Sequence, residues 1–254
     1  MSASVEAGPH SRRFGVEIEC GLPGGTRHAR ELFEFQPDSP YFNKDGWCVD
    51  SDGSGVELKT PILQGEEGYE KVHWAMEKLK DAGAFVTTAD GLHIHHDAPE
   101  FVNNLHKCLQ LVQSWRNNEQ LIFEMVAPRR RNGPPCPAWD NWAFTHLRDL
   151  LEGEDDYFET GRFDLNISSL ADHGTIEIRL HEGTLDADVA IAWIKFGQCF
   201  IHDALQSSQA MRASKTDATL LSRIRLSPEA QAILAAKKSE NYITAGSKFR
   251  SHNY

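Results

Sequence analysis

Four short segments alternate between apolar and charged residues, and this alternation restricts the fold more than any other feature of the chain. They lie at residues 14–19, 56–59, 92–95 and 175–180. Side chains of a β-strand point alternately to its two faces, so each segment has one apolar and one charged face. Such segments predict an antiparallel sheet that buries its apolar face.

The charged faces carry residue types that bind metals and phosphate, namely Glu17, Glu19, Glu57, His93, His95, Glu177 and Arg179. If the four segments share one sheet, these side chains gather on one face. Neighbouring carboxylates raise each other's pKa unless cations lie between them. Oxygen and imidazole ligands suit divalent ions, and arginine binds phosphate. The sequence thus predicts a metal and phosphate site; the alternative is the ordinary wetted face of an antiparallel sheet.

The spacing within single segments adds to this interpretation. Glu17 and Glu19 lie roughly 6.5–7 Å apart on a strand, a separation that serves two neighbouring metal ions. His93 and His95 likewise share a face. A cupin site would begin with the same His-x-His pattern, but there the chain continues as a β-barrel, whereas Pro99 is expected here in the first turn of a helix.

Composition and charge exclude several classes of protein. The 254 residues are 40% hydrophobic and 25% charged, as in a soluble globular protein. A net charge of −11 argues against duplex DNA or an anionic membrane as the main partner. The five cysteines show no CxxC spacing, and no apolar run approaches the length of a membrane span. We therefore expect a cytoplasmic protein with reduced thiols. Phosphate-binding loops of the GxxxxGK[ST] and GxGxxG types are absent from the sequence.

The order of the predicted elements indicates an α+β fold. Strands are expected at 13–20, 46–50, 55–59, 85–88, 91–96, 164–167 and 175–180, and helices at 28–35, 66–82, 97–123, 187–205 and 228–238. Hairpin turns are expected at 51–54 and 172–174. This order predicts a single domain with an antiparallel sheet whose apolar face is covered by helices. We divide the chain into a lead-in (1–12), a catalytic domain (13–205) and a helical C-terminal extension (206–254).

A basic, proline-rich loop at residues 128–141 offers a further arginine cluster. We interpret it either as a surface crossing or as a lid over bound substrate. Possible substrate-binding residues are Asn166, Arg116, Arg129, Arg130 and Arg131.

Taken together and in this order, the motifs FGVEIE (14–19), DGSGVELKTP (52–61), GLHIH (91–95) and TIEIRLHEGT (175–184) resemble the amidoligase family. That family belongs to the carboxylate–amine ligase superfamily, together with glutamine synthetase and glutamate–cysteine ligase. The resemblance covers roughly residues 12–205.

The resemblance implies an ATP-dependent ligase that joins a carboxylate to an amine through an acyl phosphate. Its fold would be a glutamine synthetase-like, mostly antiparallel, curved sheet with helices on the convex face and with ATP and Mg²⁺ or Mn²⁺ on the concave face. It implies metal ligands at Glu17, Glu19, Glu57, His93 and Glu177. His95 and Arg179 match residues near the phosphates, and Arg179 and Glu57 are the expected catalytic residues. The substrates would be small-molecule or peptide carboxylates and amines, and oligomers are expected in some relatives.

Two other functions remain open on sequence grounds. The same acids and histidines would suit a metal-dependent hydrolase that activates water without ATP. A ligase-like fold could also persist as a catalytically silent nucleotide or peptide binder. The residues leave the acid and the amine unnamed.

Overall fold

The computed structural model describes residues 8–36, 41–52, 55–131, 136–152 and 163–238. Its strands are β1 (Phe14–Cys20), β2 (Cys48–Asp52), β3 (Gly55–Lys59), β4 (Gly91–Asp97), β5 (Leu165–Asn166) and β6 (Thr175–Glu182). Its α-helices are α1 (Gly25–Leu32), α2 (Gly65–Asp81), α3 (Leu105–Glu124), α4 (Asn141–Glu152), α5 (Ser169–His173), α6 (Ala187–Gln206) and α7 (Asp217–Arg223). Short 3-10 helices are η1 (Pro9–Ser11), η2 (Pro99–Phe101) and η3 (Pro128–Arg130). A further helical segment covers residues 228–238.

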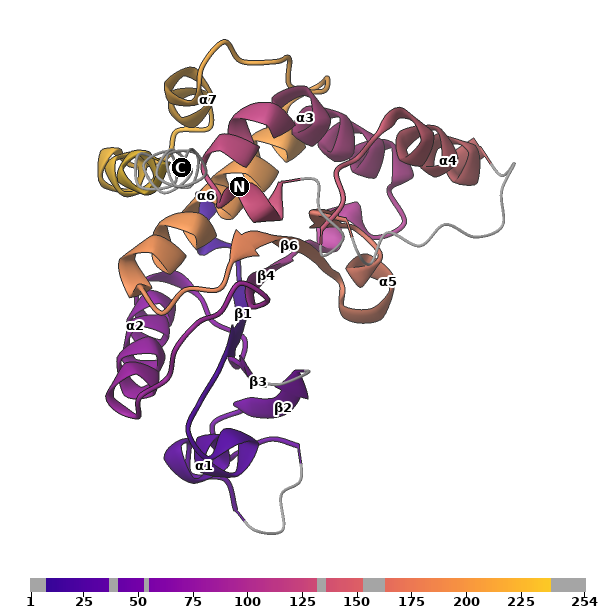
Figure 1. The fold of residues 1–254 in the computed structure, drawn as a ribbon. Helices are drawn as coiled ribbons and strands as arrows, with labels where there is room; N and C mark the ends of the chain where they lie inside the picture. Colours follow the sequence, from indigo (N-terminus) through magenta and orange to yellow (C-terminus); the bar gives the residue numbers. More distant parts are fainter. Residues whose placement is uncertain (1–7, 37–40, 53–54, 132–135, 153–162, 239–254) are drawn as a thin grey trace, which may run out of the picture.

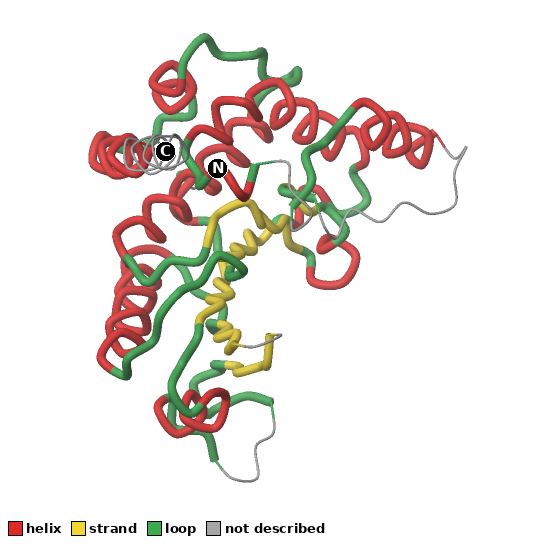
Figure 2. The backbone as a smooth tube through the Cα atoms, in the orientation of Figure 1, coloured by secondary structure: helices red, strands yellow, loops and turns green. Residues whose placement is uncertain are grey.

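The strands form one curved antiparallel sheet in the order β2-β3-β1-β4-β6-β5 (Figures 1 and 2), which confirms the predicted α+β fold. The first strand of the chain, β1, is central and pairs with β3 and β4. Its Glu17 lies opposite Lys59 on one side and His93 on the other. His95 in turn lies opposite Glu177. This register brings all four alternating segments into one sheet.

The apolar face of the sheet is covered by helices. Val16, Ile18, Leu58, Ile94 and Ile178 are almost fully buried. In Figure 1, α2 and α6 lie along the same side of the sheet, and the two helices contact each other. Asp186 caps α6 as predicted, since its side chain accepts hydrogen bonds from the backbone N–H groups of Asp188 and Val189.

One predicted helix is divided in two. The segment 97–123 was expected to be continuous, but the chain forms η2 and then begins α3 at Leu105. Asn103 adopts a left-handed conformation with φ of 56°, which an α-helix cannot accommodate. Asn104 then caps α3 by accepting a hydrogen bond from Lys107 N. The prediction of one long helix was therefore wrong because asparagine tolerates the conformation that interrupts it.

Other differences lie in the connections. The expected strand at 85–88 is reduced to a single bridge between Phe85 and Gly21. A short helix, α5, stands in place of the turn predicted at 172–174, and Gly174 ends it with φ of 66°. Helices α4 and α7 were not predicted, whereas the helix at 228–238 is confirmed. Part of the predicted turn at 51–54 and part of the 128–141 loop lie outside the described residues.

All five cysteines are free and buried. Within the part of the chain that the structure describes, no helix has the length and apolar character needed to cross a bilayer.

Candidate functional site

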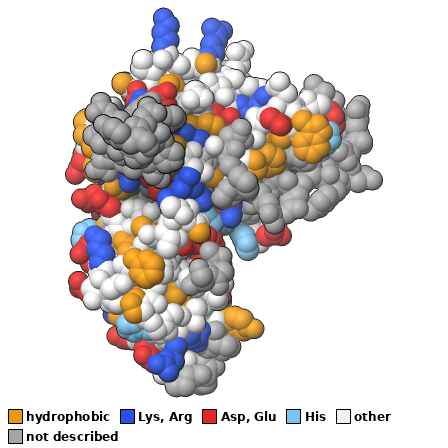
Figure 3. All heavy atoms as spheres, viewed as in Figure 1, with side chains coloured by type: hydrophobic (Ala, Val, Ile, Leu, Met, Phe, Trp, Pro, Cys, Tyr) orange, Lys and Arg blue, Asp and Glu red, His pale blue; other side chains and the backbone are white. Residues whose placement is uncertain are grey.

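The charged face of the sheet gathers acids and histidines from four strands. β1 contributes Glu17 and Glu19, β3 contributes Glu57, β4 contributes the two histidines and β6 contributes Glu177. In Figure 3, acidic and histidine side chains are visible at the inner bend of the molecule, where its surface is hollowed. The cluster follows from strand alternation, because residues two apart on neighbouring antiparallel strands project from the same face.

His93 lies among three carboxylates. Its Nδ1 is 3.2 Å from Glu17 Oε2 and 3.6 Å from Glu177 Oε1, and its Nε2 is 3.4 Å from Glu19 Oε1. Only 4% of His93 is exposed. A side chain on Gly91 would strike this imidazole, since an added Cβ would lie 2.8 Å from His93 Nε2. Glycine at this position therefore leaves room for the histidine.

Two groups of three side chains are arranged as a metal ion would require. Glu17, His95 and Glu177 form one triad, and Glu17, Glu57 and His93 form the other; within each, the ligand atoms lie within 4.8 Å of one another. We call them the His95 triad and the His93 triad. Glu17 belongs to both, so one carboxylate could bridge two adjacent cations.

Glu177 is held by a network of donors. Asn166 Nδ2 donates to Glu177 Oε2 at 2.7 Å, and Ser169 Oγ donates to the same oxygen at 3.3 Å. Arg179 contacts the other oxygen, with Nη1 2.5 Å from Oε1. These contacts fix the carboxylate so that Oε1 faces the histidines.

A lysine on β3 enters the cluster from its other side. Lys59 Nζ lies 2.9 Å from Glu57, 3.1 Å from Asp50 and 3.7 Å from Glu17. Burial and the two neighbouring histidines act on the pKa of Glu17. Burial favours its protonated form, but hydrogen bonds with His93 and His95 outweigh burial and lower the pKa.

Glu57 is shifted in the opposite direction. Burial and then the charge of Glu17 raise the pKa of Glu57, and contact with Lys59 only partly offsets them. The two acids therefore compete for the same nearby cation, as expected for carboxylates that share a site.

A cavity of about 710 Å³ opens beside the cluster. Glu17, Lys59 and His95 line its polar end. Tyr41, Phe42 and Ile62 line it elsewhere, and all three are large apolar side chains with more than half of their surface exposed. The cavity thus joins a charged region to an apolar one.

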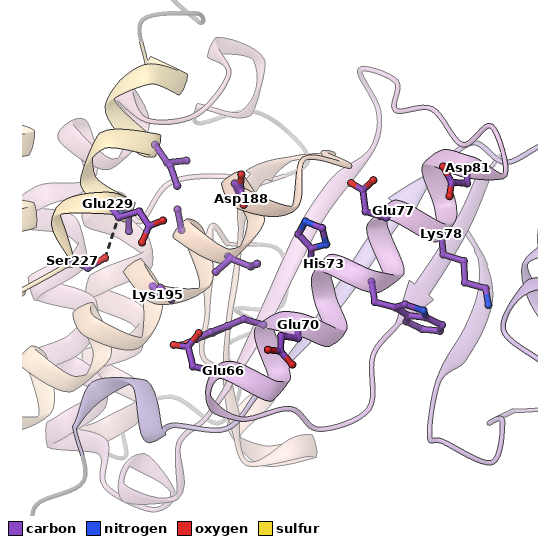
Figure 4. A pocket seen from close by; sticks show the side chains of 16 residues that line it. Glu66, Glu70, His73, Glu77, Lys78, Asp81, Asp188, Lys195, Ser227 and Glu229 are labelled. Carbon is purple, nitrogen blue, oxygen red and sulfur yellow. Dashed lines mark hydrogen bonds between the residues drawn. The ribbon is translucent and has the colours of Figure 1, made fainter.

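A second cavity, of about 790 Å³, lies between α2, α6 and the start of the 228–238 helix (Figure 4). Glu66, Glu70, Glu77 and Asp188 are among its lining residues, with His73 between them. These residues belong to the helices that cover the apolar face of the sheet. None of the triad residues lines this cavity.

Three of the arginines proposed from sequence as substrate ligands, Arg129, Arg130 and Arg131, donate hydrogen bonds to backbone carbonyls. Arg130 is buried, and its guanidinium donates to the backbone carbonyls of Leu180 and Arg179. Arg131 donates to Val126 O, and Arg129 donates to Thr87 O.

Arg116 projects from α3 and donates to Trp139 O and Asn141 Oδ1. The contacts of Arg116, Arg130 and Arg131 therefore tie the 128–141 region to its surroundings, and none of them is an ion pair with a triad residue. Arg130 comes nearest to the site, because its Nη2 lies 3.0 Å from where a Cβ on Gly91 would stand.

Sequence reasoning missed three participants in the cluster. Lys59 shares the charged face of β3 with Glu57, so the alternation of this strand could have revealed the lysine. Ser169 lies on α5, outside any strand, and no periodic signal connects it with Glu177. Thr175 also supports the site, since its Oγ1 lies 3.0 Å from His95 Nδ1.

Comparison with known families gives one match. The family model described as putative amidoligase enzyme matches residues 29–201, about two thirds of the chain. The matched region contains Glu57, both histidines and Glu177, and it begins after β1. No curated protein matched the chain.

Proposed function

The chain belongs to the amidoligase family of ligase-type enzymes, and from this premise we propose that it joins a carboxylate to an amine at the expense of ATP. The reaction would pass through an acyl phosphate, formed when the carboxylate attacks the γ-phosphate of ATP and releases ADP. The amine would then displace phosphate and form the amide. The observation that carries this proposal is the pair of triads beside Arg179 on one face of the sheet.

The donor set fits Mg²⁺ or Mn²⁺. Carboxylate oxygens with one imidazole in each triad are ligands that Mn²⁺ accepts readily, and carboxylates also suit Mg²⁺. We propose that Glu17, His95 and Glu177 hold one such ion, and that Glu17, Glu57 and His93 form the neighbouring position, with Glu19 supporting His93. When bound, a divalent ion neutralises phosphate charge during phosphoryl transfer.

Arg179 is our choice for the residue that stabilises charge on the transferred phosphoryl group. Its Nη1 is engaged by Glu177, which orients the guanidinium. Its Nε is buried and has no hydrogen-bond partner within the described residues. A quarter of the Arg179 side chain is exposed, so a phosphate oxygen could reach the other donor atoms of the guanidinium.

The cavity beside the cluster has the character that a nucleotide requires. We propose that the nucleoside packs against Tyr41, Phe42 and Ile62, while the phosphates extend toward His95 and the His95 triad. Apolar walls also limit water, which would hydrolyse an acyl phosphate. Buried free cysteines agree with a reducing compartment, so we propose that the enzyme works in the cytoplasm on small-molecule or peptide substrates.

Calorimetry with ATP tests this proposal. The wild type should bind ATP in the presence of Mg²⁺ and lose at least tenfold in affinity without it. Glu17→Gln should weaken binding in Mg²⁺ by at least tenfold, or about 1.4 kcal/mol, because Glu17 serves both triads.

Glu67→Gln is the matched control, since Glu67 pairs with Lys71 on the exposed surface of α2. It should bind ATP as the wild type does. A wild-type protein that binds no ATP with either Mg²⁺ or Mn²⁺ would contradict the proposal, and turnover of a substrate without ATP would favour a hydrolase. Positive binding would justify screening acid–amine pairs for ADP release.

A further inference from the structure

Lys59 makes three ion pairs with acids from three adjacent strands. Its Nζ is within 4 Å of Asp50 on β2, Glu57 on its own strand β3, and Glu17 on β1. About a third of its side chain is exposed, less than for Lys71 on α2, which pairs with one glutamate. Lys59 is therefore enclosed by carboxylates rather than lying along the surface.

The position of this ammonium overlaps one of the two triads. Glu17 and Glu57 are two of the three members of the His93 triad, and both are ion-paired with Lys59. A divalent ion bound by the same two carboxylates would lie next to a fixed positive charge. Like charges at such separations repel strongly in a partly buried site.

The His95 triad has a different environment. The ion pairs of Lys59 do not extend to Glu177, and the cation beside Glu177 is Arg179. Lys59 reaches this triad only through the shared Glu17, at 3.7 Å, whereas it pairs with both carboxylates of the His93 triad and lies 2.9 Å from Glu57. The ammonium of Lys59 thus lies closer to the His93 triad than to the His95 triad, so a divalent ion at the His95 triad meets less repulsion from it.

We propose that the ammonium of Lys59 takes the place of one divalent cation, so that the protein without nucleotide binds a single ion, at the His95 triad. The inference rests on the proposed metal-binding function and refines it. The single positive charge of Lys59 is shared among Asp50, Glu57 and Glu17, and it offsets part of the negative charge that a second ion would otherwise neutralise. Of the two cations beside the triads, one would then be a bound metal ion and the other the ammonium of Lys59.

Counting bound Mn²⁺ tests this inference without nucleotide, substrate or catalytic activity. Equilibrium dialysis followed by metal analysis should find one Mn²⁺ per wild-type chain, with an electron paramagnetic resonance spectrum of an isolated ion. Lys59→Met removes the charge but keeps the length of the side chain, and it should bind two Mn²⁺ with spin coupling between neighbouring ions.

Two further variants separate charge from structure. Lys59→Arg keeps the positive charge and should bind one Mn²⁺ per chain, as the wild type does. If Lys59 had only a structural role, the number of bound ions would not depend on the charge at this position. Lys71→Met removes a surface lysine paired with an acid and should bind as the wild type does. If Lys59→Met unfolds, Lys59→Gln replaces it, and the wild-type count and spectrum still stand as a test.

The outcomes distinguish the inference from the proposed function. Two coupled Mn²⁺ ions in the wild type, or one ion in both wild type and Lys59→Met, would overturn the role of Lys59 and leave the metal site intact. No Mn²⁺ in either protein would overturn both. One ion in the wild type and two in Lys59→Met would support both.

Discussion

Glu177 depends on neighbours that have no charge of their own. Asn166 and Ser169 both donate to its Oε2, and the carboxylate has only 3% of its surface exposed. A side chain that fixes a metal ligand commonly contributes ten- to a hundredfold to metal affinity. The amide of Asn166 thus positions Glu177, whereas its predicted contact with substrate stays a prediction.

Asn166→Ala should weaken Mn²⁺ binding by about tenfold, because Glu177 loses the donor at 2.7 Å. Isothermal titration with Mn²⁺ measures this directly. Asn117→Ala is the control, since Asn117 also donates from its amide but to Met211 O, which does not belong to the cluster. Equal Mn²⁺ affinity in the wild type and Asn166→Ala would show that Ser169 and Arg179 suffice to hold Glu177.

Sequence alone could assign the charged residues to one face, because alternation with period two is a property of each strand. It could not supply the register, so the pairing of Glu17 with both histidines and with Lys59 required the structure. The substrate roles predicted for Arg116, Arg130 and Arg131 rested on charge alone. In the structure, Arg130 and Arg131 donate to backbone carbonyls, and Arg116 donates to a carbonyl and to Asn141 Oδ1; the substrate roles stay predictions.

At the scale of elements, α6 lies very close to the sheet at Gly197. A Cβ added there would lie 2.2 Å from His96 Nε2 and 2.8 Å from Ile178 Cδ1. His96 and Ile178 are fully buried on β4 and β6. The absence of a side chain on one helical residue therefore sets the distance between α6 and the strands that carry His95 and Glu177.

Gly197→Ala should lower the free energy of unfolding by about 1–3 kcal/mol, the usual effect of overpacking a core. Helix propensity alone predicts the opposite, a gain of about 1 kcal/mol for alanine inside a helix. Urea denaturation of the two proteins decides between these effects. A more stable alanine variant would mean that α6 moves away from the sheet at little cost.

The elements with regular periodicity were the ones that sequence predicted well, and α2 and α6 agree within a residue or two. The failures occurred where local conformation or tertiary packing decides. Asn103 interrupts the helix predicted at 97–123, and Phe85 pairs with Gly21 without extending into a strand. Helix α4 follows a proline-rich loop whose composition gave no helical signal.

At the scale of the whole molecule, stability is tied to a buried acid between α3 and β5. Asp164 has no exposed surface, and it accepts a hydrogen bond from Trp115 Nε1 at 2.9 Å. Burial, followed by the nearby charge of Glu119, raises the pKa of Asp164 well above its ordinary value. The carboxyl therefore keeps its proton in the folded protein at pH values where the unfolded chain has lost it.

The free energy of unfolding should consequently fall as the pH rises above about 4, because the folded state then binds more protons than the unfolded state. Asp164→Asn removes this titration. The free energy of unfolding of the variant, compared with that of the wild type, should therefore increase from pH 5 to pH 8. Urea denaturation at both pH values measures the difference, with the exposed Asp45→Asn as control. If the free energies of unfolding of the wild type and of Asp164→Asn change by the same amount between the two pH values, Asp164 does not hold its proton.

The central position of β1 has a consequence for the order in which the protein is made. β1 is synthesised before both of its partners, β3 and β4, so it has no complete sheet to join until residue 97 has been made. Glu177 arrives a further 80 residues later, opposite His95. Pairings so distant in sequence form slowly. Strands β1 to β4 of the nascent chain must therefore wait for β6 before Glu177 completes the His95 triad.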